Sequence, residues 1–407
     1  MRFRLLLLAL AALFAQPLHA APRDGWTAVW APAQMVPAGD QVVPPEWLED
    51  ATLRQVVRVG IAAPRVRLRL SNAFGTDPLA IGGAAVARSA DNRTARIEPA
   101  TLAVVTFGGR PETVIPAGAE AWSDPVEIAV APGTDLAVSL HLPKAPARPT
   151  GHPGSRATSY FAPGNQLSAE TLPSDRTAAR WLILAGIEAY APEARAVAVF
   201  GDSITDGFGV QPDTNLRWTD HLAARLRADP ELAQVAVLNA GIGGNRLLLD
   251  GLGPNALARF ERDVLSQPGV THVIVLEGVN DLGVLTRDGP ATPEQHAALV
   301  ERATEALRQM VLRARARGIK AIGATILPFG ASGYYHPPAE TEADRQAINA
   351  WIRAPGNFDA VIDFDAAMRD PADPSRLDPA LDSGDGLHPS LEGYRAMAAA
   401  VPLELLR

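Results

Sequence analysis

Residues 200–209 read FGDSITDGFG and lie where the composition of the chain changes abruptly. Five apolar residues, 196–200, lead into the stretch, and polar residues and glycines follow them. A short apolar run that ends at Gly-Asp-Ser predicts a buried strand that opens into a loop. Ligands bind at such strand ends in open parallel sheets. The stretch therefore raises the question of whether Ser203 is a nucleophile or an ordinary turn residue.

Downstream of residue 195, apolar runs alternate with segments of helical pattern. Further apolar runs occupy residues 235–238, 270–276, 319–326 and 361–364. Helical patterns cover 294–317, which Gly318 ends, and 340–353, and a last one follows Ser390. Strand–helix alternation predicts a parallel sheet that is covered on both faces. Five strands predict a flavodoxin-like, doubly wound α/β domain.

Upstream, residues 24–192 show the two-residue period of half-buried strands. Apolar residues alternate over 66–70, 126–130 and 136–142, and the turn 131–134 lies between the last two runs, as in a hairpin. We expect an antiparallel β-sandwich of jelly-roll-like form. The change of pattern near Ala191-Pro192-Glu193 predicts two domains, at residues 21–192 and 193–407.

The first twenty residues have the pattern of a secretory signal peptide. Arg2 and Arg4 precede an apolar stretch from Leu5 to Phe14, and Ala20 offers a small residue for cleavage. The apolar stretch is well short of the roughly 20 residues that cross a bilayer. We therefore expect cleavage near Ala20, a secreted or periplasmic protein, and no stable membrane anchor.

Composition limits the classes of partner and cofactor. The 407 residues have a formal net charge of −8 and no cluster of Lys and Arg, so we expect no nucleic-acid partner. The chain has no cysteine, which excludes a disulfide, a cysteine nucleophile and a thiolate metal site. Its eight histidines do not cluster with carboxylates at metal-ligand spacing. We predict neither a metal nor another cofactor.

Polar and glycine residues follow the predicted strands in a recurring way. Three blocks follow the first three strands, and a fourth lies near the C-terminus: Gly201-Asp202-Ser203, Asn239 to Asn245 (NAGIGGN), Gly278-Val279-Asn280-Asp281 and Asp385-Gly386-Leu387-His388-Pro389. Loops at the carboxyl ends of parallel strands meet at one edge of a sheet. We therefore expect these blocks to share one cleft.

In this order, the four blocks resemble those of the SGNH hydrolases, also called GDSL esterases. The resemblance covers the chain from Arg195 to the C-terminus. It implies that Ser203, Gly244, Asn280 and His388 are the four residues that name the family. It also implies that Asp385 is the acid three residues before the histidine. Gly241 and Gly243 are further candidates for the glycine. The resemblance favours Gly244, because the family's glycine usually falls five residues after an asparagine, here Asn239.

These residue types suit acyl transfer. A serine hydroxyl needs a base, which His388 can supply, and Asp385 can orient the imidazole and stabilise its protonated form. The oxyanion that forms on the attacked carbonyl needs donors. The backbone N–H groups of Ser203 and Gly244 and the side-chain amide of Asn280 could provide three. One such donor is worth about 10²–10³ in rate.

Other polar residues receive structural interpretations. Asp382 is the alternative to Asp385, while Asp202 and Asp281 are expected to hold loops. His152 is expected on a surface loop, with a place at a domain interface as the alternative. His336 either lines a pocket or is exposed. Trp26 and Trp30 are expected to pack in the sandwich rather than to form a sugar-stacking platform.

The resemblance implies a secreted serine esterase that forms an acyl-enzyme on Ser203 and prefers short-chain or acetyl esters. A β-sandwich before such a domain is similar to secreted two-domain carbohydrate esterases, so an acetylated polysaccharide is a candidate substrate. A lipase, lysophospholipase or general arylesterase is the alternative. A carbohydrate-binding protein with an inactive hydrolase half is an alternative of another class, although Ser203, Asn280, Asp385 and His388 are all present.

Overall fold

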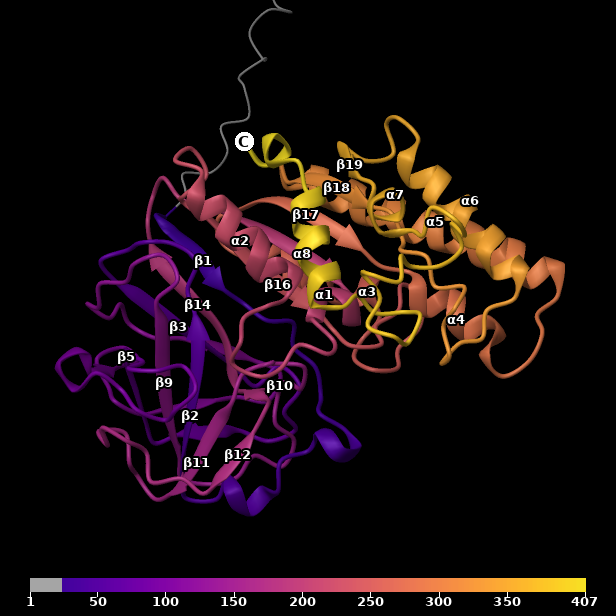
Figure 1. Ribbon diagram of the computed structural model, residues 1–407. Coiled ribbons are helices and arrows are strands. Elements are labelled where there is room, and N and C mark those ends of the chain that lie inside the picture. Colours follow the sequence, from indigo (N-terminus) through magenta and orange to yellow (C-terminus); the bar gives the residue numbers. More distant parts are fainter. Residues whose placement is uncertain (1–23) are drawn as a thin grey trace, which may run out of the picture.

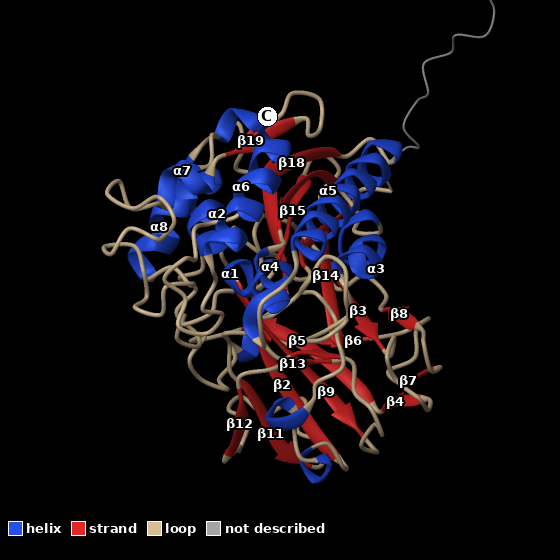
Figure 2. Ribbon diagram, turned by 90° about the vertical axis from the view of Figure 1, so that its right-hand side faces the viewer, coloured by secondary structure: helices blue, strands red, loops and turns tan. Residues whose placement is uncertain are grey.

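The computed structural model describes residues 24–407, and the predicted signal peptide lies outside the described residues. Two parts with different secondary structure follow one another along the chain (Figure 1). The first part is built of antiparallel strands, and the second is a parallel sheet between helices (Figure 2). None of the helices in the described range combines the length and apolar character that a membrane span requires.

The β half consists of two main antiparallel sheets, which confirms the predicted sandwich. The first sheet has the order β1 (Trp26–Trp30), β14 (Leu184–Tyr190), β3 (Val66–Ser71) and β8 (Glu120–Trp122). The second has the order β12 (Arg176–Ala178), β11 (Ser159–Pro163), β2 (Ala51–Arg58), β9 (Asp135–Leu142), β5 (Gly83–Arg88) and β6 (Ala103–Val105). Two short pairs complete it: β10 (Gly151–His152) with β13 (Trp181–Leu182), and β4 (Leu79–Ile81) with β7 (Thr113–Ile115). Leu53, Leu68 and Val138 share one apolar core between the main sheets.

The predicted hairpin over residues 126–142 is wrong. β9 pairs with β2 and β5 of the second sheet, whereas Val126 makes an isolated bridge to Val66 of β3 in the first sheet. A local hydrogen bond from Ile128 N–H to Val126 C=O interrupts the ladder there. The segment also lies between Pro125 and Pro132, which have no N–H to donate. Alternating apolar residues therefore mark a buried edge segment here, and the turn carries the chain between sheets.

The second half has the predicted doubly wound sheet. Its five strands are β15 (Arg195–Gly201), β16 (Val235–Gly241), β17 (Val270–Leu276), β18 (Lys320–Ala324) and β19 (Ala360–Ile362). Their order is β16-β15-β17-β18-β19, and every neighbouring pair is parallel. Because buried parallel strands are apolar on both faces, short runs such as 270–276 could be located accurately.

Helices cover both faces of this sheet. One face packs against α3 (Ala256–Phe260), which continues as a π-helical segment (Glu261–Leu265), and against α4 (Val279–Arg287), α5 (Pro293–Ala316) and α6 (Ala339–Arg353). The other face packs against α2 (Trp218–Ala228), α7 (Phe364–Met368) and α8 (Leu391–Ala400). Ser390 caps α8 by accepting a hydrogen bond from Gly393 N–H, so the predicted last helix begins where expected.

The two halves pack directly against each other. Only residues 191–194 separate β14 from β15, and the Ala28 N–H of β1 donates to Pro268 C=O at 2.9 Å. The sandwich core extends into the parallel sheet through Ala196, Ala236 and Leu238. This apolar seam joins the sandwich to the start of β15, and the rest of that strand leads to Ser203.

Candidate active site

Ser203 begins a four-residue helix, α1 (Ser203–Asp206), directly after β15. Asp202 caps this helix by accepting a hydrogen bond from Ile204 N–H at 2.9 Å, which confirms its expected loop-holding role. A Cβ on Gly201 would lie 2.7 Å from Leu276 C=O, so the chain can make this tight exit only with glycine. The strand and its cap thus present the Ser203 hydroxyl at the carboxyl edge of the sheet.

The hydroxyl of Ser203 contacts the imidazole of His388, and the imidazole contacts the carboxylate of Asp385. Ser203 Oγ lies 2.9 Å from His388 Nε2, and His388 Nδ1 lies 2.7 Å from Asp385 Oδ2. The other carboxylate oxygen accepts hydrogen bonds from the backbone N–H groups of Leu387 and His388, at 2.9 and 2.8 Å. Ser203 and His388 are each only 8% exposed. The three side chains form a continuous hydrogen-bonded chain in which Ser203 and His388 are buried and Asp385 is exposed.

Asp382, the alternative to Asp385, has a different task. Its Oδ1 accepts hydrogen bonds from the N–H groups of Gly384 and Gly386, at 2.9 and 3.1 Å. It closes the turn before His388, while Asp385 contacts the imidazole. Asp385 lies three residues before His388, and its carboxylate also accepts a hydrogen bond from the backbone N–H of His388. This second bond holds the carboxylate beside the imidazole.

The electrostatics favour a neutral imidazole and a charged carboxylate. Burial lowers the pKa of His388 below its ordinary value, and this outweighs the opposing effect of Asp385. For Asp385, burial alone would raise the pKa, but the hydrogen bonds from His388 and Leu387 lower it below the ordinary range. At neutral pH His388 can therefore accept a proton while Asp385 stays ionised.

The candidate oxyanion donors lie on neighbouring loops. Within residues 24–407, the backbone N–H groups of Ser203 and Gly244 donate to no other group of the chain. Of the three candidate glycines, only Gly244 has a left-handed backbone, with φ +74°, and a Cβ there would lie 2.5 Å from Leu252 Cδ1. Gly241 instead packs against α1, because its Cβ would lie 2.4 Å from Asp206 N.

Asn280 is held by two hydrogen bonds that fix its amide. Its Nδ2 donates to Asn245 C=O at 2.7 Å, and its Oδ1 accepts from the hydroxyl of Tyr335 at 2.6 Å. A carbonyl oxygen can only accept a hydrogen bond, so the Asn280 amide atom that contacts Asn245 C=O is the nitrogen. Tyr335 packs over Gly283, where a Cβ would lie 2.4 Å from the ring. Tyr335 could not be predicted from the sequence, because it lies in the irregular segment after β18.

The acid beside Asn280 also holds a loop, as expected. Asp281 accepts hydrogen bonds from the N–H groups of Leu247 and Leu248, at 2.7 and 3.1 Å. Burial raises its pKa to about 6. Asp281 thus ties the loop after β17 to the glycine loop after β16, which keeps Gly244 and Asn280 in one arrangement.

Arg259 joins three strand ends beneath the site and was missed by the sequence analysis. This fully buried side chain of α3 donates to Gly201 C=O, Ala240 C=O and Asn245 Oδ1, at 2.9, 2.7 and 2.8 Å. It also pairs with Glu277 at 3.1 Å. Its place could not be predicted, because an arginine on a helix is normally solvated.

Two further acids near Arg259 have raised pKa values. Burial raises the pKa of Asp202 to about 7. Burial, and then the charge of Asp202, raises the pKa of Glu277 well above its ordinary value. The floor of the site is thus a buried network of acids around one guanidinium.

A loop of the β half is part of the site, which corrects the interpretation of His152. This histidine is 3% exposed rather than on a surface loop. Its Nε2 lies 2.9 Å from Asp206 Oδ1 at the end of α1, and its Nδ1 donates to Ala33 C=O at 2.9 Å. A Cβ on Gly154 would lie 1.9 Å from Asp206 Oδ2. The spacing of residues along the chain did not predict that this loop would contact α1, the helix that begins with Ser203.

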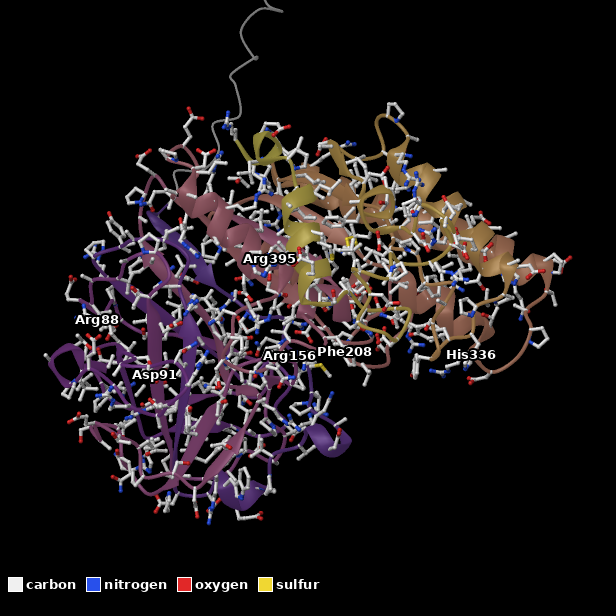
Figure 3. The ribbon with its side chains drawn as sticks, viewed as in Figure 1. Arg88, Asp91, Arg156, Phe208, His336 and Arg395 are labelled. Carbon is white, nitrogen blue, oxygen red and sulfur yellow. The ribbon has the colours of Figure 1, made fainter. Side chains whose placement is uncertain are left out.

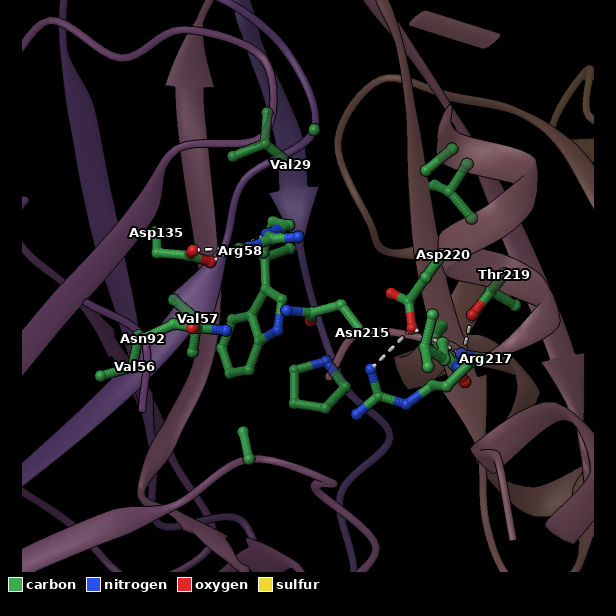
Figure 4. A pocket seen from close by; sticks show the side chains of 18 of the residues that line it. Val29, Val56, Val57, Arg58, Asn92, Asp135, Asn215, Arg217, Thr219 and Asp220 are labelled. Atoms are coloured by element: carbon green, nitrogen blue, oxygen red, sulfur yellow. Dashed lines mark hydrogen bonds and ion pairs between the residues drawn. The ribbon is translucent and has the colours of Figure 1, made fainter. Parts of the chain in front are cut away.

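A cavity of about 200 Å³ lies along the seam beside this loop (Figure 4). Arg58 of the β half pairs there with Asp135 at 2.6 Å, and Arg217 pairs with Asp220 at 3.2 Å. His152 and Asp206 also line it. The cavity therefore reaches the rear of the nucleophile helix.

The remaining candidate residues lie away from the reacting groups. His336 is exposed, with φ +47°. Trp26 and Trp30 are buried, and their rings pack edge-on against Tyr190 and Trp181. This confirms that the two tryptophans pack in the sandwich.

Comparison with known proteins identifies the second half. A family model described as the GDSL-like Lipase/Acylhydrolase family matches residues 199–396. No curated protein matches the chain. Among solved structures, Axe2, an acetylxylan esterase from Geobacillus stearothermophilus, is 25% identical, with 51% of this chain and 91% of that chain covered and a TM-score of 0.38. A GDSL-like lipase from Bacteroides thetaiotaomicron VPI-5482 is 20% identical, with 51% and 85% covered and a TM-score of 0.36. Residues 199–396 are therefore a GDSL-like lipase/acylhydrolase domain, which supports a carboxylic ester hydrolase.

Proposed function

We propose that this chain is a serine esterase that cleaves short-chain esters, acetyl esters above all, through an acyl-enzyme on Ser203. The observation that carries the proposal is the pair of contacts of 2.9 and 2.7 Å that joins Ser203, His388 and Asp385. The lowered pKa of His388 supports it further, because the general base must be neutral at the start of the reaction.

In the proposed reaction, Ser203 Oγ attacks the ester carbonyl while its proton moves to His388 Nε2. The oxyanion accepts hydrogen bonds from the N–H groups of Ser203 and Gly244 and from Asn280 Nδ2, which has one hydrogen beyond the one given to Asn245. His388 then returns the proton to the leaving alcohol. A water molecule gives its proton to His388, attacks the acyl group and releases the acid, and Ser203 regains its proton.

A short acyl group fits the surroundings of Gly244. The side chain of Leu252 lies directly over this glycine and restricts the space beside the proposed oxyanion position. Shortening this side chain in Leu252→Ala should therefore move the preferred acyl chain of 4-nitrophenyl esters from acetate toward butyrate or hexanoate. A wild-type preference for long acyl chains would favour the lipase alternative.

We also propose that the protein is exported and that its two domains have different roles. Residues 1–20 would act as a signal peptide cleaved near Ala20, so that the enzyme works in the periplasm or outside the cell. Residues 21–192 would form an accessory domain and residues 193–407 the catalytic domain. The mass of the exported protein tests the first part, since a chain that begins at Ala21 is expected. An acetylated polysaccharide is the proposed natural substrate.

The deciding experiment measures acid release from 4-nitrophenyl acetate. Ser203→Ala should abolish turnover, and His388→Ala should lower kcat by at least about 10³, because these residues act as a unit. Ser168→Ala, a matched change on an exposed loop of the β half, should leave the rate unchanged. Mass spectrometry of the wild type after rapid acid quenching should show one added acetyl group, absent in Ser203→Ala. Near-normal turnover by a folded His388→Ala protein would contradict the mechanism.

A further inference from the structure

The loop 151–158 of the β half places a positive charge beside the proposed catalytic residues. Thr158 donates to the carboxylate of Asp213 from its N–H and its hydroxyl, at 2.7 and 2.6 Å. Asp213 N–H donates to Arg156 C=O at 2.9 Å, and Arg217 donates to Ser155 C=O. Arg156 itself has φ +49°, a conformation uncommon for a residue with a side chain. These contacts hold Arg156 in a conformation that the local sequence does not favour.

The side chain of Arg156 extends toward the imidazole of His388. Its guanidinium carbon lies 6.0 Å from the centre of the Phe208 ring. That ring stacks on His388, with centres 4.0 Å apart and planes inclined by 24°. Figure 3 shows Arg156 and Phe208 next to each other where the two halves meet. The distance from the guanidinium carbon to the centre of the imidazole ring therefore does not exceed the sum of these two distances.

Arg156 has no acid to balance its charge. Among the described residues, no carboxylate lies within ion-pair distance of it, and its half-buried side chain has an Nε atom that is buried without a partner. Arg58 and Arg217, which line the cavity at the seam, and Arg259 beneath the site are each paired with an acid. In a chain with net charge −8, an unpaired guanidinium beside the site is available to bind an anionic group of a ligand.

The position of Arg156 also indicates which part of an ester it would meet. In the proposed reaction His388 returns its proton to the leaving alcohol, so the alcohol part must lie beside the imidazole. Gly244 and Asn280 would instead contact the carbonyl oxygen. Arg156 is linked to the imidazole through Phe208, whose C=O is held by the hydroxyl of Tyr394 at 2.8 Å. A group next to the alcohol oxygen is therefore the one within reach of Arg156.

We propose that Arg156 binds a carboxylate on the alcohol part of the substrate, so that the preferred substrates are acylated hydroxy acids, including acetylated uronic acid residues of a polysaccharide. This inference rests on the proposed esterase function and adds the substrate class. A guanidinium is suited to the task because its planar donors match the two oxygens of a carboxylate. The β half would thereby select the substrate whose ester bond the second half cleaves.

The experiment compares 4-acetoxybenzoate, whose alcohol part is anionic, with its neutral methyl ester. The quantity measured is kcat/KM for 4-acetoxybenzoate divided by kcat/KM for its methyl ester. When this ratio is compared between variants, the difference in intrinsic reactivity between the two esters cancels. In Arg156→Asn the ratio should fall about tenfold, since a charge-assisted hydrogen bond is lost. Asparagine suits the left-handed backbone at this position, and Arg156→Lys, which keeps the charge, should keep part of the preference.

A matched variant controls for the overall charge of the protein. Arg110→Gln removes one charge at an exposed turn of the β half and should leave the ratio as it is in the wild type. An unchanged ratio in Arg156→Asn would overturn the proposal. On the acyl side, the same comparison uses mono-4-nitrophenyl succinate and its methyl ester. A fall in the ratio for this pair alone would show that Arg156 serves the acid part, which would also overturn it.

Binding measurements separate this inference from the esterase function. The amide analogue 4-acetamidobenzoate should bind wild type and Ser203→Ala more tightly than Arg156→Asn in calorimetry, whether or not any ester is hydrolysed. Equal binding by all three proteins would contradict the site. Acetylated polygalacturonate and acetylated xylan then distinguish polymeric uronic acids from small hydroxy acids. A polymer preference that Arg156→Asn abolishes would support the uronic acid, and no polymer hydrolysis would restrict the site to small hydroxy acids.

Discussion

The parallel half and the β half contribute to the site by different kinds of contact. In the parallel half, some orienting hydrogen bonds are local, as between Asp202 and Ile204 or between Asp385 and His388, and others join loops at neighbouring strand ends, as between Asn280 and Asn245. In the β half, the loop 151–158 depends on partners far along the chain, such as Asp206 for His152 and Asp213 for Thr158. Substitutions in the parallel half should therefore affect the chemical step, whereas those in the β half should affect position and selectivity.

The largest effect is expected from Asp385→Asn, compared with Asp382→Asn. The first substitution removes the charge beside His388 Nδ1 and favours the wrong tautomer, so kcat should fall by about 10³–10⁴. In the second, the amide oxygen can still accept the N–H groups of Gly384 and Gly386, so kcat should stay within about threefold of wild type, since neither bond is lost. The measurement is turnover of 4-nitrophenyl acetate. Equal losses in both variants would show that the loop, and not the charge of Asp385, sustains the reaction.

A substitution in the β half tests the other side of the comparison. In Gly154→Ala the new Cβ would collide with the carboxylate of Asp206, and the shift of this carboxylate should disturb its 2.9 Å contact with His152, which ties the loop to α1. A displacement of about 1 Å can cost roughly 10² in rate, so kcat should fall by up to that amount while the serine, histidine and acid remain. Gly333→Ala, where a Cβ meets no other atom, is the control. Wild-type kcat in a folded Gly154→Ala protein would show that the loop does not position the nucleophile.

The comparison also explains which residues the sequence could predict. Ser203 and Asn280 follow apolar strands, and parallel strand ends meet at one edge whatever the details of packing. Asp385 and His388 lie just before α8, where the Asp-x-x-His-Pro motif marks them. Arg156 and Tyr335 lie in irregular segments, and His152 lies in the two-residue strand β10, whose positions depend on how distant elements pack. Arg259 was missed for a related reason, because only the assembled sheet shows that its helix faces three strand ends. The error at 126–130 has the same origin, since alternation does not say which sheet a segment joins.

A smaller effect is expected from Tyr335→Phe. The variant keeps the ring over Gly283 but removes the hydroxyl that donates to Asn280 Oδ1 at 2.6 Å. The amide then retains only its bond to Asn245 and is less well oriented, so kcat should fall about tenfold, with KM nearly unchanged, as for a donor used in the transition state. Tyr334→Phe on the exposed neighbour is the control. A change in KM alone would mean that Tyr335 acts in binding rather than in orienting Asn280.

The smallest effect is a shift in pH dependence that links the two halves. Burial lowers the pKa of His388, and the charge of Arg156 lowers it further, while Asp385 and Asp382 act in the opposite direction. Because the base must be neutral, kcat/KM should be lost on acidification with a midpoint below about 6.5, the ordinary value for histidine. Asp202, with a pKa of about 7, would give a midpoint above that value if its ionisation controlled the rate.

The Arg156→Asn variant decides between these two assignments of the acid limb. Without the nearby positive charge, protonation of His388 becomes easier, so the midpoint should move upward by a few tenths of a pH unit, toward the ordinary histidine value. Arg110→Gln should not move it, because that turn lies outside the site. The measurement uses the neutral methyl 4-acetoxybenzoate, so that substrate charge cannot contribute. An unchanged midpoint in Arg156→Asn would mean that the β half does not act on His388 electrostatically. Its influence would then be confined to the positions of the substrate and the nucleophile.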